Sequence, residues 1–236
     1  MGKQAELDLR RLDRNGQHRG GHRVGAGRPK SRVRASERHK KRMLFRASQP
    51  LHVVTRVVPR IHSLRRRELY AAIRDATITV AKHEDVRIVH LSIQRTHLHL
   101  IVEAVGQAAL GRGMQSFLVS AARTINRALR QRGTVFADRY HATVLTSPRQ
   151  VRNCVAYVLN NWRRHGEDRE RRWAIDPFSS GVSFGGWKEL QHRYTAFRPP
   201  PSYASLIVWF PKTWLLAVGW RKHGRIGAFE TPRGTE

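Results

Sequence analysis

Two histidines at alternate positions of an apolar run could bind a metal ion together. The run is Thr96-His97-Leu98-His99-Leu100-Ile101-Val102, and alternate side chains of a β-strand lie on the same face. His97 and His99 would then point the same way and could hold one divalent cation, while Leu98 and Leu100 point into the core. The alternative is a solvent-facing strand that carries two histidines by chance.

A tyrosine and an asparagine further along the chain form a second candidate pair. The segment 151–161 has the apolar stripe of a helix, and Tyr157 and Asn161 are four residues apart, on one face of that helix. A tyrosine hydroxyl, with an ordinary pKa of about 10, is a weak nucleophile. A divalent cation assists attack on a phosphodiester by polarising the phosphate and stabilising the leaving oxygen. Attack would give a covalent phosphotyrosine, whereas the alternative is a core tyrosine with a helix-end asparagine.

Alternating strands and helices must position these residues. Alternation and β-branched runs predict strands, and apolar residues at helical spacing predict helices. Ser147 and Pro148 are a typical N-cap and first residue of the last helix. The expected strands are His52–Val58, Val86–Gln94, His97–Ala104 and His141–Thr146, and the expected helices are Leu64–Lys82, Leu110–Arg130 and Pro148–Arg164.

The order β-α-β-β-α-β-α predicts an α+β protein of the ferredoxin-like, split βαβ kind. We expect an antiparallel four-stranded sheet with helices on one face, the other face free for a ligand, and an extra helix that carries Tyr157. Three segments are predicted: a basic arm at 1–48, a catalytic domain at 49–166, and a C-terminal extension at 167–236. The extension, which holds five of the six tryptophans, is expected to be a small helical appendage.

The charge of the chain indicates a polyanionic partner. Forty-five Lys and Arg against 17 Asp and Glu give a net charge of +28, and nucleic acid is the ordinary partner of such an excess. One cysteine, Cys154, allows no disulfide or Cys-based zinc site, so any metal would be bound by His, Asp, Glu, Asn or Gln. No long apolar span or secretory segment is evident, and we expect a cytoplasmic, nucleoid-associated protein with no membrane partner.

Several basic and aromatic residues are candidates for DNA contact. The first 50 residues hold 15 Lys and Arg against 4 Asp and Glu, and Arg28 lies in a Gly-Arg-Pro sequence like that of minor-groove AT-hooks. The alternative for this segment is a generic basic arm. Near the candidate chemistry, the residues expected to hold a DNA strand are Arg139, Tyr140, Arg152, Arg163 and Arg164. Tyr140 is also the rival of Tyr157 as nucleophile.

Over roughly His52–Gly166 the sequence resembles the HUH single-tyrosine transposases, in particular their REP-associated type. The resemblance lies in the strand Thr96–Val102, the segment Val135–His141 and the helix Tyr157–Asn161. It implies metal binding by His97 and His99, attack on single-stranded DNA by Tyr157, and a third metal ligand at Asn161. Asn161 stands where the family often has Gln, and Arg95-Thr96 stands where Pro-Asn is common.

The resemblance therefore implies a transposase that cleaves and rejoins single-stranded or hairpin DNA with Mg²⁺ or Mn²⁺, through a 5′-phosphotyrosine, as a monomer or a homodimer. One alternative is a replication-initiator or relaxase nuclease with the same chemistry. The other is a domesticated or inactive nucleic-acid-binding protein. An enzyme and an inactive nucleic-acid-binding protein differ in whether Tyr157, His97 and His99 converge.

Overall fold

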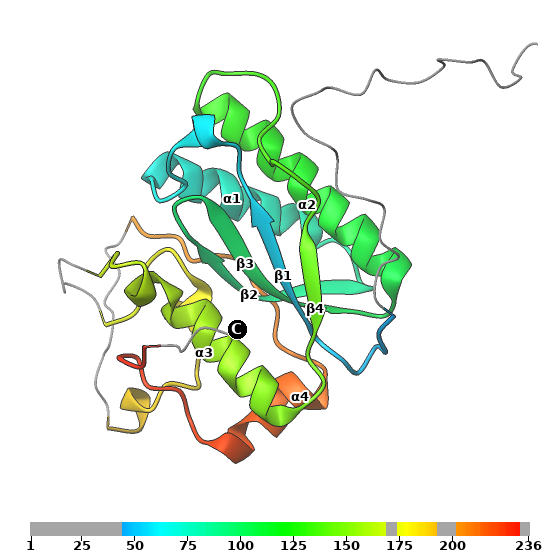
Figure 1. The fold of residues 1–236 in the computed structure, drawn as a ribbon, viewed down its shortest axis with the longest axis vertical. Coiled ribbons are helices and arrows are strands. Elements are labelled where there is room, and N and C mark those ends of the chain that lie inside the picture. Colours follow the sequence, from blue (N-terminus) through cyan, green and yellow to red (C-terminus); the bar gives the residue numbers. More distant parts are fainter. Residues whose placement is uncertain (1–43, 169–173, 193–201, 232–236) are drawn as a thin grey trace, which may run out of the picture. The chain divides into compact units, whose positions relative to one another are not determined.

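The computed structural model of the protein describes residues 44–168, 174–192 and 202–231. These residues all belong to one compact unit, Arg42–Glu236. Figure 1 shows a sheet with long helices on both of its faces. The strands are β1 (Leu51–Arg56), β2 (Val86–Ile93), β3 (His97–Ala104) and β4 (His141–Val144), and the helices are α1 (Arg67–Val80), α2 (Gln107–Ala128), α3 (Pro148–Arg164) and α4 (Trp214–Ala217). Short 3-10 turns lie at Pro59–Ile61, Ser180–Ser183, Glu189–His192 and Gly219–His223.

The four strands form an antiparallel sheet in the order β2-β3-β1-β4. Each βαβ unit is therefore split by a strand from the other half, which is the arrangement that the element order predicts. The bounds of β3 and α3 agree with those expected from the sequence. Helix α1 begins at Arg67 rather than Leu64, because Leu64 is fully buried in the loop before the helix, where its backbone N–H donates to Arg95.

Helices α1 and α2 cover one face of the sheet and form the first core. Leu98, Leu100 and Val102 point from β3 into this core and are fully buried. Helix α2 lies close against β2 at Gly113, where an added Cβ atom would come within 2.4 Å of a Val86 methyl carbon. A side chain at this position would require Val86 or the helix itself to shift.

The second face of the sheet is not left free, contrary to expectation. Helix α3 lies on it. Together with residues 174–192 and 202–231, which we call the C-terminal residues, it forms a second core. The buried members of this core include Val89, Ile101, Val155, Leu159, Trp187 and Trp220. Val89 and His90 form a bulge in β2, where the pairing with β3 shifts by one residue. The C-terminal residues thus share the core of the tyrosine helix.

The C-terminal residues also bond to the edge of the sheet at β2. The backbone N–H of Trp209 donates to the carbonyl of Ile88, and that of Ile93 donates to the carbonyl of Phe178. Ser179 forms an antiparallel bridge with Ser92. These contacts partly cover an edge that would otherwise present unpaired backbone groups. Within the described part of the chain, no helix is long and apolar enough to cross a membrane.

Candidate active site

The two histidines of β3 lie side by side on the face that α3 covers. The Nε2 atoms of His97 and His99 are 3.0 Å apart, and the two rings are nearly perpendicular. Two nitrogen ligands about 2.1 Å from one cation and at right angles to each other would be separated by about 3.0 Å. The pair therefore has a spacing that fits two adjacent ligands of a single cation.

Other ligands would have to complete such a metal site. Among the described residues, no group of three or more His, Cys, Asp or Glu side chains is arranged to hold a metal ion. Glu103, on the same face of β3, is used elsewhere: it accepts hydrogen bonds from the backbone N–H groups of Lys212 and Thr213. The remaining positions suit oxygen ligands such as an amide, water or the phosphate of a substrate, as Mg²⁺ and Mn²⁺ prefer.

A third histidine, His52 of β1, contacts this pair and was not expected from the sequence. Its Nε2 atom lies 3.1 Å from Nδ1 of His99, and the two rings stack with centroids 5.2 Å apart. If His99 donates this bond, its Nε2 atom carries the lone pair that faces His97. A partner of this kind fixes the orientation and the tautomer of a metal-binding histidine.

The three imidazoles are held in their neutral form. Burial, followed by the neighbouring His97 and His52, lowers the pKa of His99 from its ordinary 6.5 to about 2. Burial, followed by the charges of His165 and Arg56, lowers the pKa of His97 to about 4. Burial and His141 lower the pKa of His52 to about 4. Neutral imidazoles keep the lone pairs that metal binding requires.

Helix α3 brings Tyr157 to these histidines. The helix begins at Pro148, and the Oγ atom of Ser147 accepts a hydrogen bond from the backbone N–H of Gln150 at 3.3 Å. The half-buried Tyr157 ring meets His99 edge-on, with centroids 5.1 Å apart, and lies 5.9 Å from His52. The helix and the sheet therefore bring the tyrosine and the histidines together.

Asn161, one turn beyond Tyr157, has a buried amide without a partner. Its side chain is fully inaccessible, and neither its Nδ2 nor its Oδ1 atom makes a hydrogen bond. Leaving a buried polar group unpaired costs about 1–3 kcal/mol. A ligand that offered a cation or a donor to Oδ1 would offset this cost, which fits the metal-binding role expected for Asn161.

Tyr140 lies on the other side of the sheet from the histidine pair. It packs against the first core, as Ala142 and Val144 of β4 also do. Tyr157 instead packs against the second core, on the face of His97 and His99. This placement favours Tyr157 over Tyr140 as the nucleophile.

The arginines expected to contact DNA fall into two groups. Arg139, before β4, and Arg164, in the last turn of α3, are exposed. The guanidinium of Arg152 instead pairs with the Glu230 carboxylate, and that of Arg163 pairs with Asp168 at 2.9 Å. Both also donate to backbone carbonyls of the C-terminal residues. Arg152 and Arg163 thus fasten α3 to the C-terminal residues, and Arg28 lies outside the described residues.

Two further basic residues lie near the histidine pair and had no signal in the sequence. Arg56 is exposed and stands directly opposite His97 in the pairing of β1 with β3. The ring of His165, which follows α3, lies 5.6 Å from that of His97. Both depend on contacts between distant parts of the chain.

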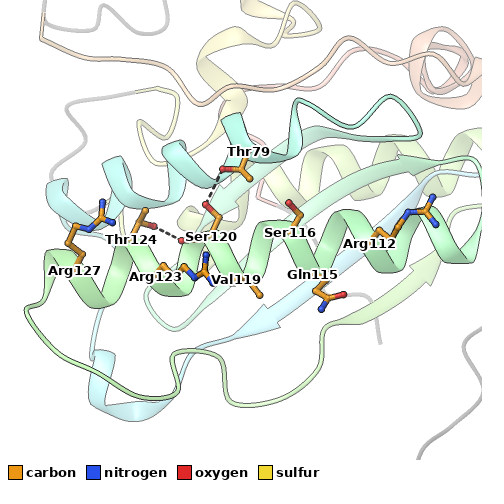
Figure 2. A pocket seen from close by; sticks show the side chains of 9 residues that line it. All are labelled: Thr79, Arg112, Gln115, Ser116, Val119, Ser120, Arg123, Thr124 and Arg127. Carbon is orange, nitrogen blue, oxygen red and sulfur yellow. Dashed lines mark hydrogen bonds between the residues drawn. The ribbon is translucent and has the colours of Figure 1, made fainter.

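A shallow groove of about 650 Å³ lies on the opposite side of the molecule, along α2. Figure 2 shows Arg112 toward one end of the helix, Arg123 and Arg127 toward the other, and the small residues Ser116 and Ser120 between them. Among the described residues no acidic side chain lines the groove, but Arg112 at its end pairs with Asp85. Because α2 packs on the first core, this groove is separate from the histidines and Tyr157.

The chain is similar in sequence and in fold to known transposases. A family model described as "Transposase IS200 like" matches residues 47–161. No curated protein matches the chain. A solved structure of a REP-associated tyrosine transposase bound to a REP hairpin is 15% identical, has a TM-score of 0.51, and covers 73% of this chain and 98% of its own. A Deinococcus radiodurans protein described as a candidate transposase is 13% identical, with a TM-score of 0.35, and covers 56% of this chain and 93% of its own. At 15% identity, the likeness to the REP-associated transposase structure concerns the fold alone.

Proposed function

Since the chain belongs to the IS200-like transposase family, we propose that it cleaves and rejoins single-stranded DNA through a covalent phosphotyrosine at Tyr157. The observation that carries this proposal is the meeting of Tyr157 with His99 and His97 in one place. These residues come from elements that are distant in the sequence. The ferredoxin-like sheet supplies the histidines and α3 supplies the tyrosine.

The proposed reaction is a transesterification. The Oη atom of Tyr157 forms a bond to the phosphorus of the scissile phosphodiester, and the bond from phosphorus to the 3′ oxygen breaks. The phenol loses its proton and the leaving 3′ oxygen gains one, so the products are a 5′-phosphotyrosine and a free 3′-hydroxyl. The reverse attack by another 3′-hydroxyl rejoins the DNA, because the phosphotyrosine ester retains the bond energy.

The residues around Tyr157 would hold a divalent cation, Mg²⁺ or Mn²⁺. His97 and His99 would bind it through their neutral Nε2 atoms, with Asn161 as a third ligand through its unpaired amide oxygen. The cation would polarise the phosphate and stabilise charge on the leaving oxygen. His52 would orient His99 by accepting a hydrogen bond from its Nδ1 atom.

The proposed substrate is single-stranded DNA that flanks a hairpin. Its support is the REP hairpin bound to the structural relative, together with the excess of 45 Lys and Arg over 17 Asp and Glu. The exposed Arg139 and Arg164 would contact phosphates near the site. In the arginine-lined groove, a phosphate backbone could bind without sequence readout.

The experiment that tests the proposal is a cleavage assay on end-labelled hairpin DNA with single-stranded flanks, in Mg²⁺ or Mn²⁺. We expect a denaturant-resistant adduct between the protein and the new 5′ end that the break creates, while the other fragment ends in a free 3′-hydroxyl. The adduct should disappear in Tyr157→Phe and persist in Tyr140→Phe, the matched control. An adduct that persists in Tyr157→Phe would refute the assignment of the nucleophile.

A non-catalytic DNA-binding protein is distinguished by the same assay. It would bind the hairpins in a salt-sensitive manner and give neither adduct nor break. A library of hairpins with randomised flanks removes dependence on a single target sequence. Absence of adduct across that library, with the protein folded and binding DNA, would overturn the proposed chemistry.

A further inference from the structure

Three large aromatic side chains are exposed within a stretch of six residues. Trp209, Phe210 and Trp214 are 43%, 90% and 51% exposed, and we name residues 209–214 the aromatic loop. Single exposed apolar residues are common on protein surfaces, but clusters of them mark binding sites. None of the three residues is required by the proposed cleavage reaction.

The aromatic loop is anchored by a buried carboxylate. Glu103, which is 2% exposed, accepts hydrogen bonds from the backbone N–H of Lys212 at 2.9 Å, and from the backbone N–H and hydroxyl of Thr213 at 2.8 and 2.7 Å. At the start of the loop, the Trp209 N–H donates to the carbonyl of Ile88 at 2.9 Å. The exposed rings are therefore carried on a backbone fixed to β2 and β3.

Two lysines lie in or next to the aromatic loop. The ammonium group of Lys222 lies 5.0 Å from the centre of the Trp214 ring, and the exposed Lys212 belongs to the loop itself. Between residues 202 and 231 the acidic residue is Glu230, and Arg152 pairs with it. Aromatic faces next to exposed cations fit a ligand with flat rings and negative charges.

The loop stands at the far end of the strand that carries the histidine pair. His97, His99 and Glu103 share one face of β3, and six residues of a strand span about 20 Å. The anchor of the aromatic loop is thus held at a fixed distance from the candidate active site. An extended polymer on this side of the sheet could reach both.

We infer that the aromatic loop is a stacking platform for unpaired nucleotides of single-stranded nucleic acid. Bases would stack on Phe210 and Trp214, and Lys212 and Lys222 would contact the adjoining phosphates. Stacking of this kind tolerates any base sequence, since every base has a flat face. The inference rests on the proposed function only in naming the platform as the place where DNA flanking the cleaved bond is held.

The test measures binding of a fluorescent oligothymidine, which forms no hairpin, to full-length Tyr157→Phe protein. We expect Phe210→Ala and Trp214→Ala each to weaken binding by about fivefold or more. Phe210 is 90% exposed, so its removal opens no cavity in the core. Phe229→Ala, which removes a phenyl ring that is 65% exposed elsewhere in the C-terminal residues, is the matched control and should leave the affinity unchanged.

The salt dependence separates stacking from charge. The slope of log affinity against log salt should stay the same in Phe210→Ala and fall by about 0.7 in Lys212→Ala, as for one phosphate contact to a single strand. Unchanged oligothymidine affinity in Phe210→Ala and Trp214→Ala would overturn the inference. If these variants instead abolished self-association in sedimentation, or binding to anionic vesicles, the loop would be a protein or lipid contact.

The platform and the cleavage chemistry can fail separately. Loss of the stacking effect with an intact Tyr157 adduct would remove the platform alone. A preserved stacking effect without any adduct would remove the proposed chemistry and leave a single-strand binding surface.

Discussion

The two faces of the sheet are built from the same strands and are used differently. On the α1 and α2 face, β3 contributes Leu98, Leu100 and Val102 to a packed apolar core. On the α3 face, the alternate residues are His97, His99, Ile101 and Glu103, of which Ile101 alone is apolar. A strand with a period of two thus separates stability from candidate chemistry. Substitutions one residue apart should have opposite consequences.

The largest expected effect is on cleavage, with little change in folding. His99→Leu removes a proposed metal ligand and replaces it with an apolar side chain that the buried site can accommodate. Loss of an outer-shell partner typically costs 10–100-fold in metal affinity or activity, so we expect His99→Leu to reduce adduct formation more than about 100-fold. Urea unfolding should remain cooperative, and an unfolded His99→Leu protein would contradict the separation of the two faces.

The neighbouring substitution Leu100→Ala should do the reverse. It removes a fully buried side chain from the first core, and we expect the free energy of unfolding to fall by about 2–5 kcal/mol. The folded fraction should still bind Mn²⁺ with normal affinity, measured by titration calorimetry at low temperature. Loss of metal binding in folded Leu100→Ala protein would show that the two faces are coupled.

His52→Leu should have a smaller effect on the same site. It leaves both proposed metal ligands and removes the partner of His99 Nδ1, so we expect metal affinity to fall about 10–100-fold. Long-range ¹⁵N–¹H spectra of the metal-free protein should show one Nδ1-protonated tautomer at His99 in the wild type and a mixture in His52→Leu. An unchanged tautomer would show that His52 does not orient His99.

Acid should lower the free energy of unfolding through the histidines on the α3 face. His52, His97 and His99 have pKa values lowered by burial from 6.5 to about 4, 4 and 2. Below pH 6.5 the unfolded chain binds protons that the folded chain does not, so stability is full above that pH and falls as the pH approaches 4. Urea midpoints between pH 7.5 and 4.5 measure this fall, which should be shallower in His99→Leu.

The smallest expected effect concerns the outer side of α2. Arg123→Ala combined with Arg127→Ala removes two exposed charges from the groove and should leave cleavage of a bound substrate unchanged. For duplex DNA, the magnitude of the salt slope should fall by up to about 1.8 if both residues contact phosphates. An unchanged slope would identify this stripe as a solvated helix face.

The parts of the fold with local signals could be predicted from the sequence. The alternation of 97–104 and the Ser147-Pro148 start of α3 depend on neighbouring residues, and both elements have the expected bounds. The sequence predicts that Leu64 begins α1, but it lies in the loop before the helix. A buried leucine in a loop has the same spacing as one in a helix. Periodicity identifies burial more reliably than it identifies the element that provides it.

Contacts between distant segments were beyond prediction. His52 meets His99 only through the register of β1 against β3. Arg152 and Arg163 resembled DNA-binding residues because Glu230 and the carbonyls that hold them lie in the C-terminal residues. The arginines of α3 that pair with the C-terminal residues cannot be distinguished from the exposed Arg164 until the chain is folded.

The shared core of α3 restricts how Tyr157, the proposed nucleophile, can move. Val155 and Leu159 are buried with Trp187 and Trp220 of the C-terminal residues, and exposing one such side chain costs about 1.5–3 kcal/mol. A swing of α3 alone, as an exchange of tyrosine helices between two protomers would need, must expose several of them together. Helix α3 and the C-terminal residues packed against it would therefore move as one rigid body, with the hinge before Pro148.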